Sequence, residues 1–183
     1  LVVSPLIALM KDQVDGLVAR GISAARLDSS LSSEEVHAIY GRMRSGELKI
    51  LYVAPERLAN ENFRRRLGEC RVSLLAIDEA HCISEWGHNF RPDYLKLASF
   101  ARELAITRVL ALTATATPPV AADIRKSFGI AEEDHIQLSF HRPNLKLCVT
   151  PCREEQKREF LLARLQADPS LPSIIYGTRQ ETA

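Results

Sequence analysis

An apolar run that ends in two adjacent carboxylates constrains this chain more than any other feature. Residues 74–77 are Leu-Leu-Ala-Ile, and Asp78 and Glu79 follow directly. Such a run is typical of a buried strand in an open α/β sheet, where ligands bind at the carboxyl ends of the strands. In nucleotide-hydrolysing folds an Asp there holds Mg²⁺, and a neighbouring carboxylate can deprotonate the attacking water. A plainer explanation is a strand end before a helix start, where acidic residues are common.

Strand-like and helix-like patterns alternate along the chain. Apolar runs predict strands at residues 1–3, 23–27, 49–53, 72–77 and 108–112. Between them, one helix is predicted to begin with Ser4 as its capping residue and to stop at Gly21. Another is predicted after Ser32, which has capping-box spacing to Glu35. Further helices are predicted at residues 94–104 and between Thr117, a predicted N-cap, and Gly129. The alternation predicts an α/β fold with a largely parallel sheet covered by helices on both faces.

Composition excludes several classes of protein. The chain has 183 residues, of which 46% are hydrophobic, and no apolar run approaches the ~20 residues of a membrane span. A net charge of +1 gives no global attraction to nucleic acid, so any DNA contact must depend on local basic residues. The four cysteines form no CxxC pair, which disfavours a zinc site and predicts reduced thiols.

Two sequence strings resemble a known family. Residues 78–81, Asp-Glu-Ala-His, match motif II of superfamily 2 helicases, and residues 82–94 resemble the aromatic-rich loop of the RecQ family of DNA helicases. The resemblance implies catalytic roles for three residues. Asp78 would position Mg²⁺ through water, Glu79 would act as the general base, and His81 would link motif II to motif III and to DNA.

The aromatic-rich loop has two interpretations from its chemistry alone. Its rings would stack on unpaired bases, or the loop would fold back and bury them. The family resemblance implies that Trp86, His88, Phe90 and Arg91 bind DNA and couple this binding to ATP hydrolysis. The family commonly has Gln before the Trp, whereas this chain has Glu85, and a carboxylate there would repel phosphate. Glu85 is therefore not predicted to bind DNA.

Three further strings resemble family motifs. Residues 4–14 resemble motif Ia, which implies that Ser4 and the first helical N–H groups meet a DNA phosphate, with Lys11 as a weaker candidate. Residues 54–58, Ala-Pro-Glu-Arg-Leu, resemble motif Ib, so Arg57 would contact DNA, although an intramolecular ion pair explains it equally well. Thr113 and Thr115 belong to a Thr-Ala-Thr-Ala string that matches motif III, whose hydroxyl groups can hydrogen-bond motif II side chains.

The resemblance also predicts a domain boundary. Residues 140–145, Phe-His-Arg-Pro-Asn-Leu, resemble the junction between the two RecA-like domains of the family. Residues 1–140 would then belong to the first domain and residues 141–183 to the beginning of the second. In the second part we expect strands at residues 145–149 and 173–176, a helix at 153–166, and the start of motif IV at 177–179.

The function implied by the resemblance is that of a DNA motor. The parent protein would use ATP and Mg²⁺ to translocate 3′ to 5′ along single-stranded DNA and to separate duplex DNA in repair and recombination. It would reside in a bacterial cytoplasm with the nucleoid, or in a nucleus. The chain contains no Gly-x-x-x-x-Gly-Lys-Ser/Thr phosphate loop, so this excerpt alone is expected to be inactive, with the loop lying N-terminal to it.

Two alternatives stay open. One is an RNA helicase of the Asp-Glu-Ala-His type, which the aromatic-rich loop disfavours. The other is a non-catalytic DNA-binding or scaffold protein that keeps the fold without the phosphate loop.

Overall fold

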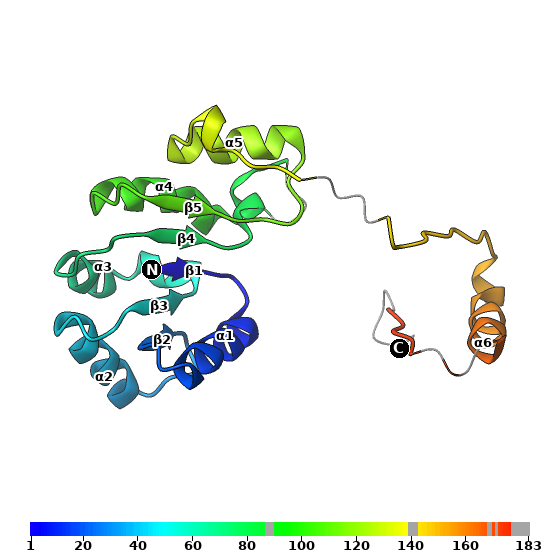
Figure 1. The fold of residues 1–183 in the computed structure, drawn as a ribbon, viewed down its shortest axis with the longest axis horizontal. Helices are drawn as coiled ribbons and strands as arrows, with labels where there is room; N and C mark the ends of the chain where they lie inside the picture. Colours follow the sequence, from blue (N-terminus) through cyan, green and yellow to red (C-terminus); the bar gives the residue numbers. More distant parts are fainter. Residues whose placement is uncertain (87–89, 139–142, 168–169, 171, 177–183) are drawn as a thin grey trace. The chain divides into compact units, whose positions relative to one another are not determined.

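The chain forms two compact units, Leu1–Leu138 and Ser139–Ala183 (Figure 1). The computed structural model describes residues 1–86, 90–138, 143–167, 170 and 172–176. The first unit contains a parallel β-sheet with its helices, and the second contains a helix near its middle.

A five-stranded sheet with strand order β2-β3-β1-β4-β5 organises the first unit (Figure 1). Its strands are β1 (Val2–Val3), β2 (Ala24–Leu27), β3 (Ile50–Val53), β4 (Leu75–Ile77) and β5 (Val109–Ala111). All neighbouring strands are parallel, and β1 pairs with both β3 and β4. The acidic pair follows β4, so it emerges between the carboxyl ends of β1 and β5. The predicted parallel sheet is confirmed.

Helices lie on both faces of this sheet. They are α1 (Ile7–Ala19), α2 (Ser33–Arg44), α3 (Glu61–Gly68), α4 (Pro92–Glu103) and α5 (Pro118–Phe128). The connection from β1 to β2 runs one way across the sheet, and those through α2, α3 and α4 run the other way. Because crossovers between parallel strands are right-handed, α1 lies on the face opposite to α2, α3 and α4.

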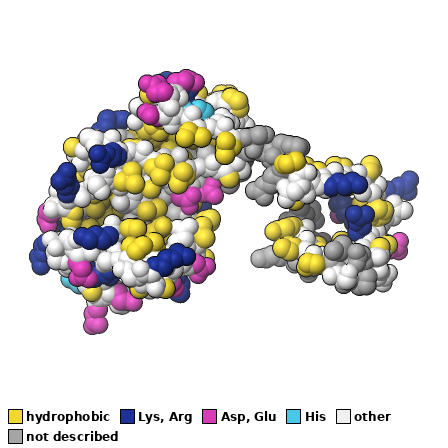
Figure 2. Space-filling view, viewed as in Figure 1, with side chains coloured by type: hydrophobic (Ala, Val, Ile, Leu, Met, Phe, Trp, Pro, Cys, Tyr) yellow, Lys and Arg dark blue, Asp and Glu magenta, His cyan; other side chains and the backbone are white. Residues whose placement is uncertain are grey.

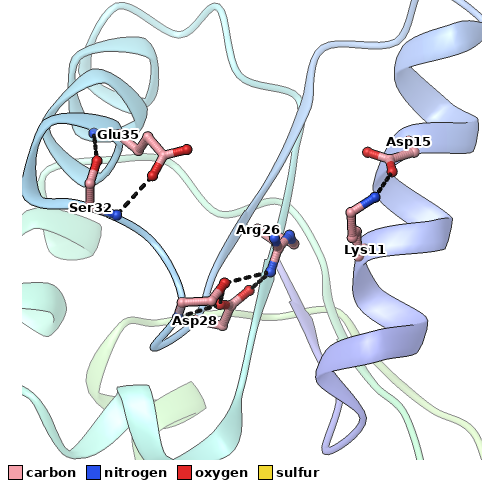
Figure 3. A network of polar contacts seen from close by, with 7 residues as sticks. Lys11, Asp15, Arg26, Asp28, Ser32 and Glu35 are labelled. Carbon is pink, nitrogen blue, oxygen red and sulfur yellow. Dashed lines mark hydrogen bonds and ion pairs between the residues drawn. The ribbon is translucent and has the colours of Figure 1, made fainter.

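Helix ends follow the sequence signals at some positions and not at others. Ser32 and Glu35 form the predicted capping box at the start of α2 (Figure 3). Gly129 ends α5 in the left-handed conformation, at φ 66°. The predicted cap at Ser4 is wrong, because α1 begins at Ile7 after Leu6 and has no side-chain cap. Thr117 is the N-cap of α5 as predicted, but its side chain makes no capping hydrogen bond.

The hydrophobic core lies on the sheet face that α2, α3 and α4 cover. Val3, Val53 and Ile77 are adjacent in register and fully buried, as are Phe63 of α3 and Tyr94 of α4. On the other face α1 packs against β2. Leu74, Leu110 and Leu112 keep 41–49% of their surface exposed. Hydrophobic side chains gather over the sheet unit in the space-filling view (Figure 2).

In the second unit the described residues form a helix and no strand. A 3-10 turn, η4 (Glu154–Gln156), leads into α6 (Lys157–Ala167), which agrees with the predicted helix. The strands predicted at residues 145–149 and 173–176 are wrong, because no described segment pairs with either of them. An apolar run becomes a strand only where a neighbour accepts its backbone hydrogen bonds, and here Leu147 and Ile174 stay 91% and 80% exposed. No helix among the described residues has the length and apolar content that crossing a membrane requires.

Candidate active site

The acidic pair is fixed at the sheet rim by backbone hydrogen bonds from both neighbouring strands. The N–H of Asp78 donates to the carbonyl of Val3, at 2.9 Å. On the other side, Leu112 donates to Ile77 at 2.8 Å, and Ala80 donates to Leu112 at 2.9 Å. The backbone on both sides of the carboxylates therefore belongs to the sheet, which makes their position rigid.

Asp78 is held by hydrogen bonds to both oxygens of its carboxylate. Ser4 Oγ donates to Oδ2 at 2.9 Å, and the N–H of Glu79 donates to Oδ1 at 3.0 Å. Ser4 is 2% exposed, so its hydroxyl faces Asp78 and not the surface. This placement does not suit the predicted contact of the Ser4 side chain with a DNA phosphate. It makes Ser4 a partner of the candidate metal ligand.

The oxygen atoms at this point suit a hard cation such as Mg²⁺. Carboxylate and hydroxyl oxygens are its preferred protein ligands, and Mg²⁺ usually keeps several waters and binds one or two carboxylates together with phosphate groups. The described residues contain no group of three or more His, Cys, Asp and Glu side chains able to hold a metal. Asp78 offers two carboxylate oxygens of the kind that such a cation binds.

Glu79 has an unusual backbone conformation. Its φ and ψ are 49° and 43°, in the left-handed region that costs a non-glycine residue about 1–2 kcal/mol. Such strained residues concentrate at functional sites. The turn starts η2 (Ala80–Ile83) and places Glu79 Oε2 3.1 Å from Nδ1 of His81. The two neighbouring acids thus have different partners, as two different roles require.

His81 joins the acidic pair to the segment after β5. Its ring is buried, and Nδ1 lies 2.9 Å from Thr113 Oγ1 and 3.4 Å from Thr115 Oγ1. This confirms the predicted meeting of motif II and motif III side chains. Because a carboxylate only accepts hydrogen bonds, Nδ1 carries a proton when it bonds Glu79.

A pocket of about 230 Å³ lies beside this cluster. The residues that line it come from four stretches of the chain: Pro5, Leu6, Glu79, His81, Cys82, Arg91, Ala114 and Thr115. It brings a carboxylate, an imidazole and a guanidinium to one space that is large enough for several water molecules. This combination provides a proton acceptor and a cation for a reaction at an anionic group.

Tyr94 supports the site in a way that the sequence did not indicate. Its hydroxyl donates a hydrogen bond to the backbone carbonyl of Asp78, at 3.1 Å, and its side chain is fully buried. Burial raises the pKa of the Tyr94 phenol, so it stays protonated and able to donate. The only signal was an aromatic residue at the end of the aromatic-rich string.

The candidate DNA-binding residues of the aromatic-rich loop have different environments. Trp86 is 81% exposed, so the alternative in which the loop buries its own rings does not hold for Trp86. Phe90 and Arg91 are partly buried, and an Arg91 guanidinium nitrogen lies 3.8 Å from Glu56 Oε1. His88 lies outside the described residues, as do residues 140–142 and 177–179.

The two other basic candidates also have intramolecular partners. Lys11 is exposed and bonds Asp15 at 2.6 Å along α1 (Figure 3). Arg57 donates to the Tyr40 hydroxyl at 3.4 Å. It lines a pocket of about 460 Å³ that also contains residues following β1, β2 and β3, among them Pro5, Asp28 and Ala54. Arg57 therefore lies at the same sheet edge as the acidic pair, in a separate hollow.

Comparison with known proteins gives one family. Residues 1–124 match the family described as DEAD/DEAH box helicase. The chain is 44% identical to the ATP-dependent DNA helicase RecQ of Bacillus subtilis, over 99% of this chain and 31% of that protein. It is 45% identical to the ATP-dependent DNA helicase RecQ of Pasteurella multocida, over 80% of this chain and 23% of that protein. The chain thus spans a third or less of these relatives.

A solved structure supports the fold. The crystal structure of the Pyrococcus furiosus Hef helicase domain is similar to this chain with a TM-score of 0.52 and 20% sequence identity. The similarity covers 70% of this chain and 27% of the other. Together with the parallel sheet, this likeness identifies the α/β fold of the first unit as RecA-like.

Proposed function

Because the chain belongs to the DEAD/DEAH box helicase family, and within it to the RecQ helicases, we propose that it is part of the motor core of an ATP-dependent DNA helicase. The parent protein would hydrolyse ATP to translocate 3′ to 5′ along single-stranded DNA and to separate duplexes in repair and recombination. One observation carries the proposal. Asp78 and Glu79 lie at the rim of a parallel sheet, and His81 links Glu79 to Thr113 and Thr115.

The acidic pair divides the chemistry between two carboxylates. Asp78, oriented by Ser4, would hold Mg²⁺ through water, and the ion would neutralise charge on the β- and γ-phosphates. Glu79 would take the proton of the attacking water in the adjoining pocket. His81 holds the Glu79 carboxylate through Nδ1 and so keeps it aimed at that water. The nucleotide site would be completed by a phosphate loop in the parent protein.

The link to DNA would run through the segments around this pocket. Arg91 lines the pocket that also contains Glu79, and it belongs to the same loop as exposed Trp86. A base stacked on the Trp86 ring would therefore bind only a few residues away from the pocket in which ATP hydrolysis takes place. Phe90 and His88 would take part in the same contact. Arg57 and Lys11 would contact the DNA backbone, a binding that is independent of sequence and weakened by salt.

The two compact units would correspond to two RecA-like domains. We propose that residues 1–140 form the first domain without its phosphate-loop part, and that residues 141–183 form the junction and the beginning of the second domain. On this assignment the excerpt alone does not turn over ATP.

Substitution of Glu79 by Gln in the full-length parent tests the proposal. The change keeps the size of the side chain and removes its basicity, so DNA-stimulated ATP hydrolysis should fall by at least about 100-fold while ATP still binds. Glu34→Gln is the matched control, because Glu34 is exposed in the first turn of α2. Turnover that survives in Glu79→Gln would remove Glu79 from the role of general base.

The same assay separates the alternatives. Stimulation of the wild-type ATPase by single-stranded DNA and not by RNA is expected for a DNA helicase. Stronger stimulation by RNA would favour the RNA helicase of the Asp-Glu-Ala-His type. DNA binding without any ATP turnover by the wild-type parent would favour the scaffold.

A further inference from the structure

We propose that Asp123 of α5 is a positioning residue for the aromatic-rich loop, which it orients through the buried hydroxyl of Ser84, and that it thereby sets how strongly DNA stimulates ATP hydrolysis. The part of this inference that concerns ATP hydrolysis rests on the proposed function. The part that concerns the orientation of Trp86 rests on geometry alone.

Three groups form a chain of hydrogen bonds at the start of the loop. Ser84 Oγ donates to Asp123 Oδ2 at 2.6 Å, and the same oxygen accepts from the backbone N–H of Trp86 at 3.2 Å. A distance of 2.6 Å is typical of a hydroxyl bound to a carboxylate, which is about twice as strong as a neutral hydrogen bond. Because the hydroxyl proton goes to Asp123, the Ser84 lone pairs are directed toward the Trp86 N–H.

Because Ser84 is buried and Trp86 is exposed, these hydrogen bonds have a strong influence on the conformation of the loop. Ser84 is 2% exposed, so loss of its partner would leave a polar group without water to replace it. Trp86 is 81% exposed, and a ring that protrudes this far gains little orientation from packing. Its direction therefore depends on the backbone at residue 86, which the Ser84 bond fixes.

The same connection also reaches the acidic pair. The segment that leaves β5 bonds His81 through Thr113 and Thr115, continues into α5, and bonds Ser84 through Asp123. His81 lies within η2 and Ser84 directly follows it, and α5 packs against η2. The segment from the end of β5 through α5 thus forms hydrogen bonds near both ends of η2. A shift of this segment on nucleotide hydrolysis would move the start of the loop, and a shift of the loop would move the segment.

Variants of Asp123 in the full-length parent test the effect on coupling. Asp123→Ala should raise the concentration of single-stranded DNA that gives half-maximal ATPase stimulation by about 5-fold or more, the usual size of coupling between two sites. Asp123→Asn keeps an acceptor oxygen for Ser84 and should restore most of the effect. Asp134→Ala is the control, because Asp134 is an exposed carboxylate of the same unit.

Ser84→Ala provides a second line of test that does not alter Asp123. It should reproduce the Asp123→Ala effect, and the double variant should be no worse than Ser84→Ala alone, because both changes remove the same chain of bonds. Additive effects of the two substitutions would overturn the proposal.

Fluorescence tests the geometry without any ATPase. The 183-residue chain contains a single tryptophan, so its emission anisotropy reports on Trp86 alone. Asp123→Ala and Ser84→Ala should lower this anisotropy, whereas Asp123→Asn and Asp134→Ala should leave it near the wild-type value. Wild-type anisotropy in both Asp123→Ala and Ser84→Ala would overturn the proposal. Lowered anisotropy in these variants of the 183-residue chain, together with a wild-type parent that lacks DNA-stimulated ATPase, would refute the proposed function and keep the positioning role.

Discussion

Single residues at the sheet rim owe their roles to partners that are distant in the sequence. The Asp78 carboxylate accepts a hydrogen bond from the Ser4 hydroxyl, and the Asp78 backbone carbonyl accepts one from the Tyr94 hydroxyl. Both partners are buried, so each bond forms in a low-dielectric environment where a lost partner is costly. The acidic residue is thus held by its side chain and by its main chain at once.

Tyr94→Phe should destabilise the folded chain and change its response to alkaline pH. Loss of the hydroxyl leaves the Asp78 carbonyl without this donor, at a cost of about 1–2 kcal/mol. Burial raises the pKa of Tyr94 above its ordinary value of about 10, so the unfolded chain loses the phenolic proton first. The stability from this group is therefore complete below pH ~10 and is lost as the pH rises further.

Urea unfolding at pH 7, 9 and 10.5 measures both effects. The wild type should lose free energy of unfolding between pH 9 and 10.5, and Tyr94→Phe should lose less over the same interval. Tyr176→Phe serves as the control, because the Tyr176 side chain is 89% exposed. Parallel pH curves for wild type and Tyr94→Phe would show that Tyr94 is not the group responsible.

Some individual elements are stabilised by interactions between residues that are close in the sequence, so these interactions can be predicted from it. The N-terminus of α2 is the clearest case, since Glu35 N–H donates to Ser32 Oγ and Ser32 N–H donates to the Glu35 carboxylate (Figure 3). The hydrogen bond from the Ser32 N–H lowers the pKa of Glu35. Two N–H groups that the helix leaves unpaired are satisfied in this way.

Ser32→Ala should lower the free energy of unfolding by about 1 kcal/mol, because it removes one bond of this capping box. Ser33→Ala is the matched control, since Ser33 is an exposed residue in the first turn of the same helix. Equal unfolding midpoints for both variants in urea would show that the capping box contributes nothing measurable.

At the scale of the whole molecule, stability resides in one unit. Every buried apolar side chain of the described residues belongs to the first unit, and α6 of the second unit has no buried residue. Hydrophobic burial is the dominant favourable term in folding, so the second unit contributes little of that term.

Removal of residues 139–183 should therefore change the free energy of unfolding by less than about 0.5 kcal/mol, the range typical of surface changes. Removal of residues 118–183 is the contrasting truncation, because it also deletes α5 with buried Val120, Ala121 and Ile124. Circular dichroism during urea unfolding should show a cooperative transition for the first truncation and loss of cooperativity for the second. A large drop in stability on removal of residues 139–183 alone would contradict the assignment of the core.

Local patterns predicted the elements well where a few neighbouring residues decide the outcome. The apolar run at 74–77 contains β4, as predicted, and Ser32 and Glu35 form the capping box that their spacing predicted. The meeting of His81 with Thr113 was also expected, because the family resemblance implied that His81 links motif II to motif III. The strands expected at 145–149 and 173–176 failed, since a strand depends on a partner that lies elsewhere in the chain.

The sequence by itself determined the alternation of strands and helices, the acidic pair at a strand end and the family resemblance, because each depends on residues close together in the chain. Only the tertiary structure decided that Ser4 binds Asp78 instead of capping α1, and that Asp123 reaches Ser84. These partners are separated by 74 and 39 positions. They meet because β1 lies beside β4 and because α5 packs against η2, and such neighbours follow from how the whole sheet assembles.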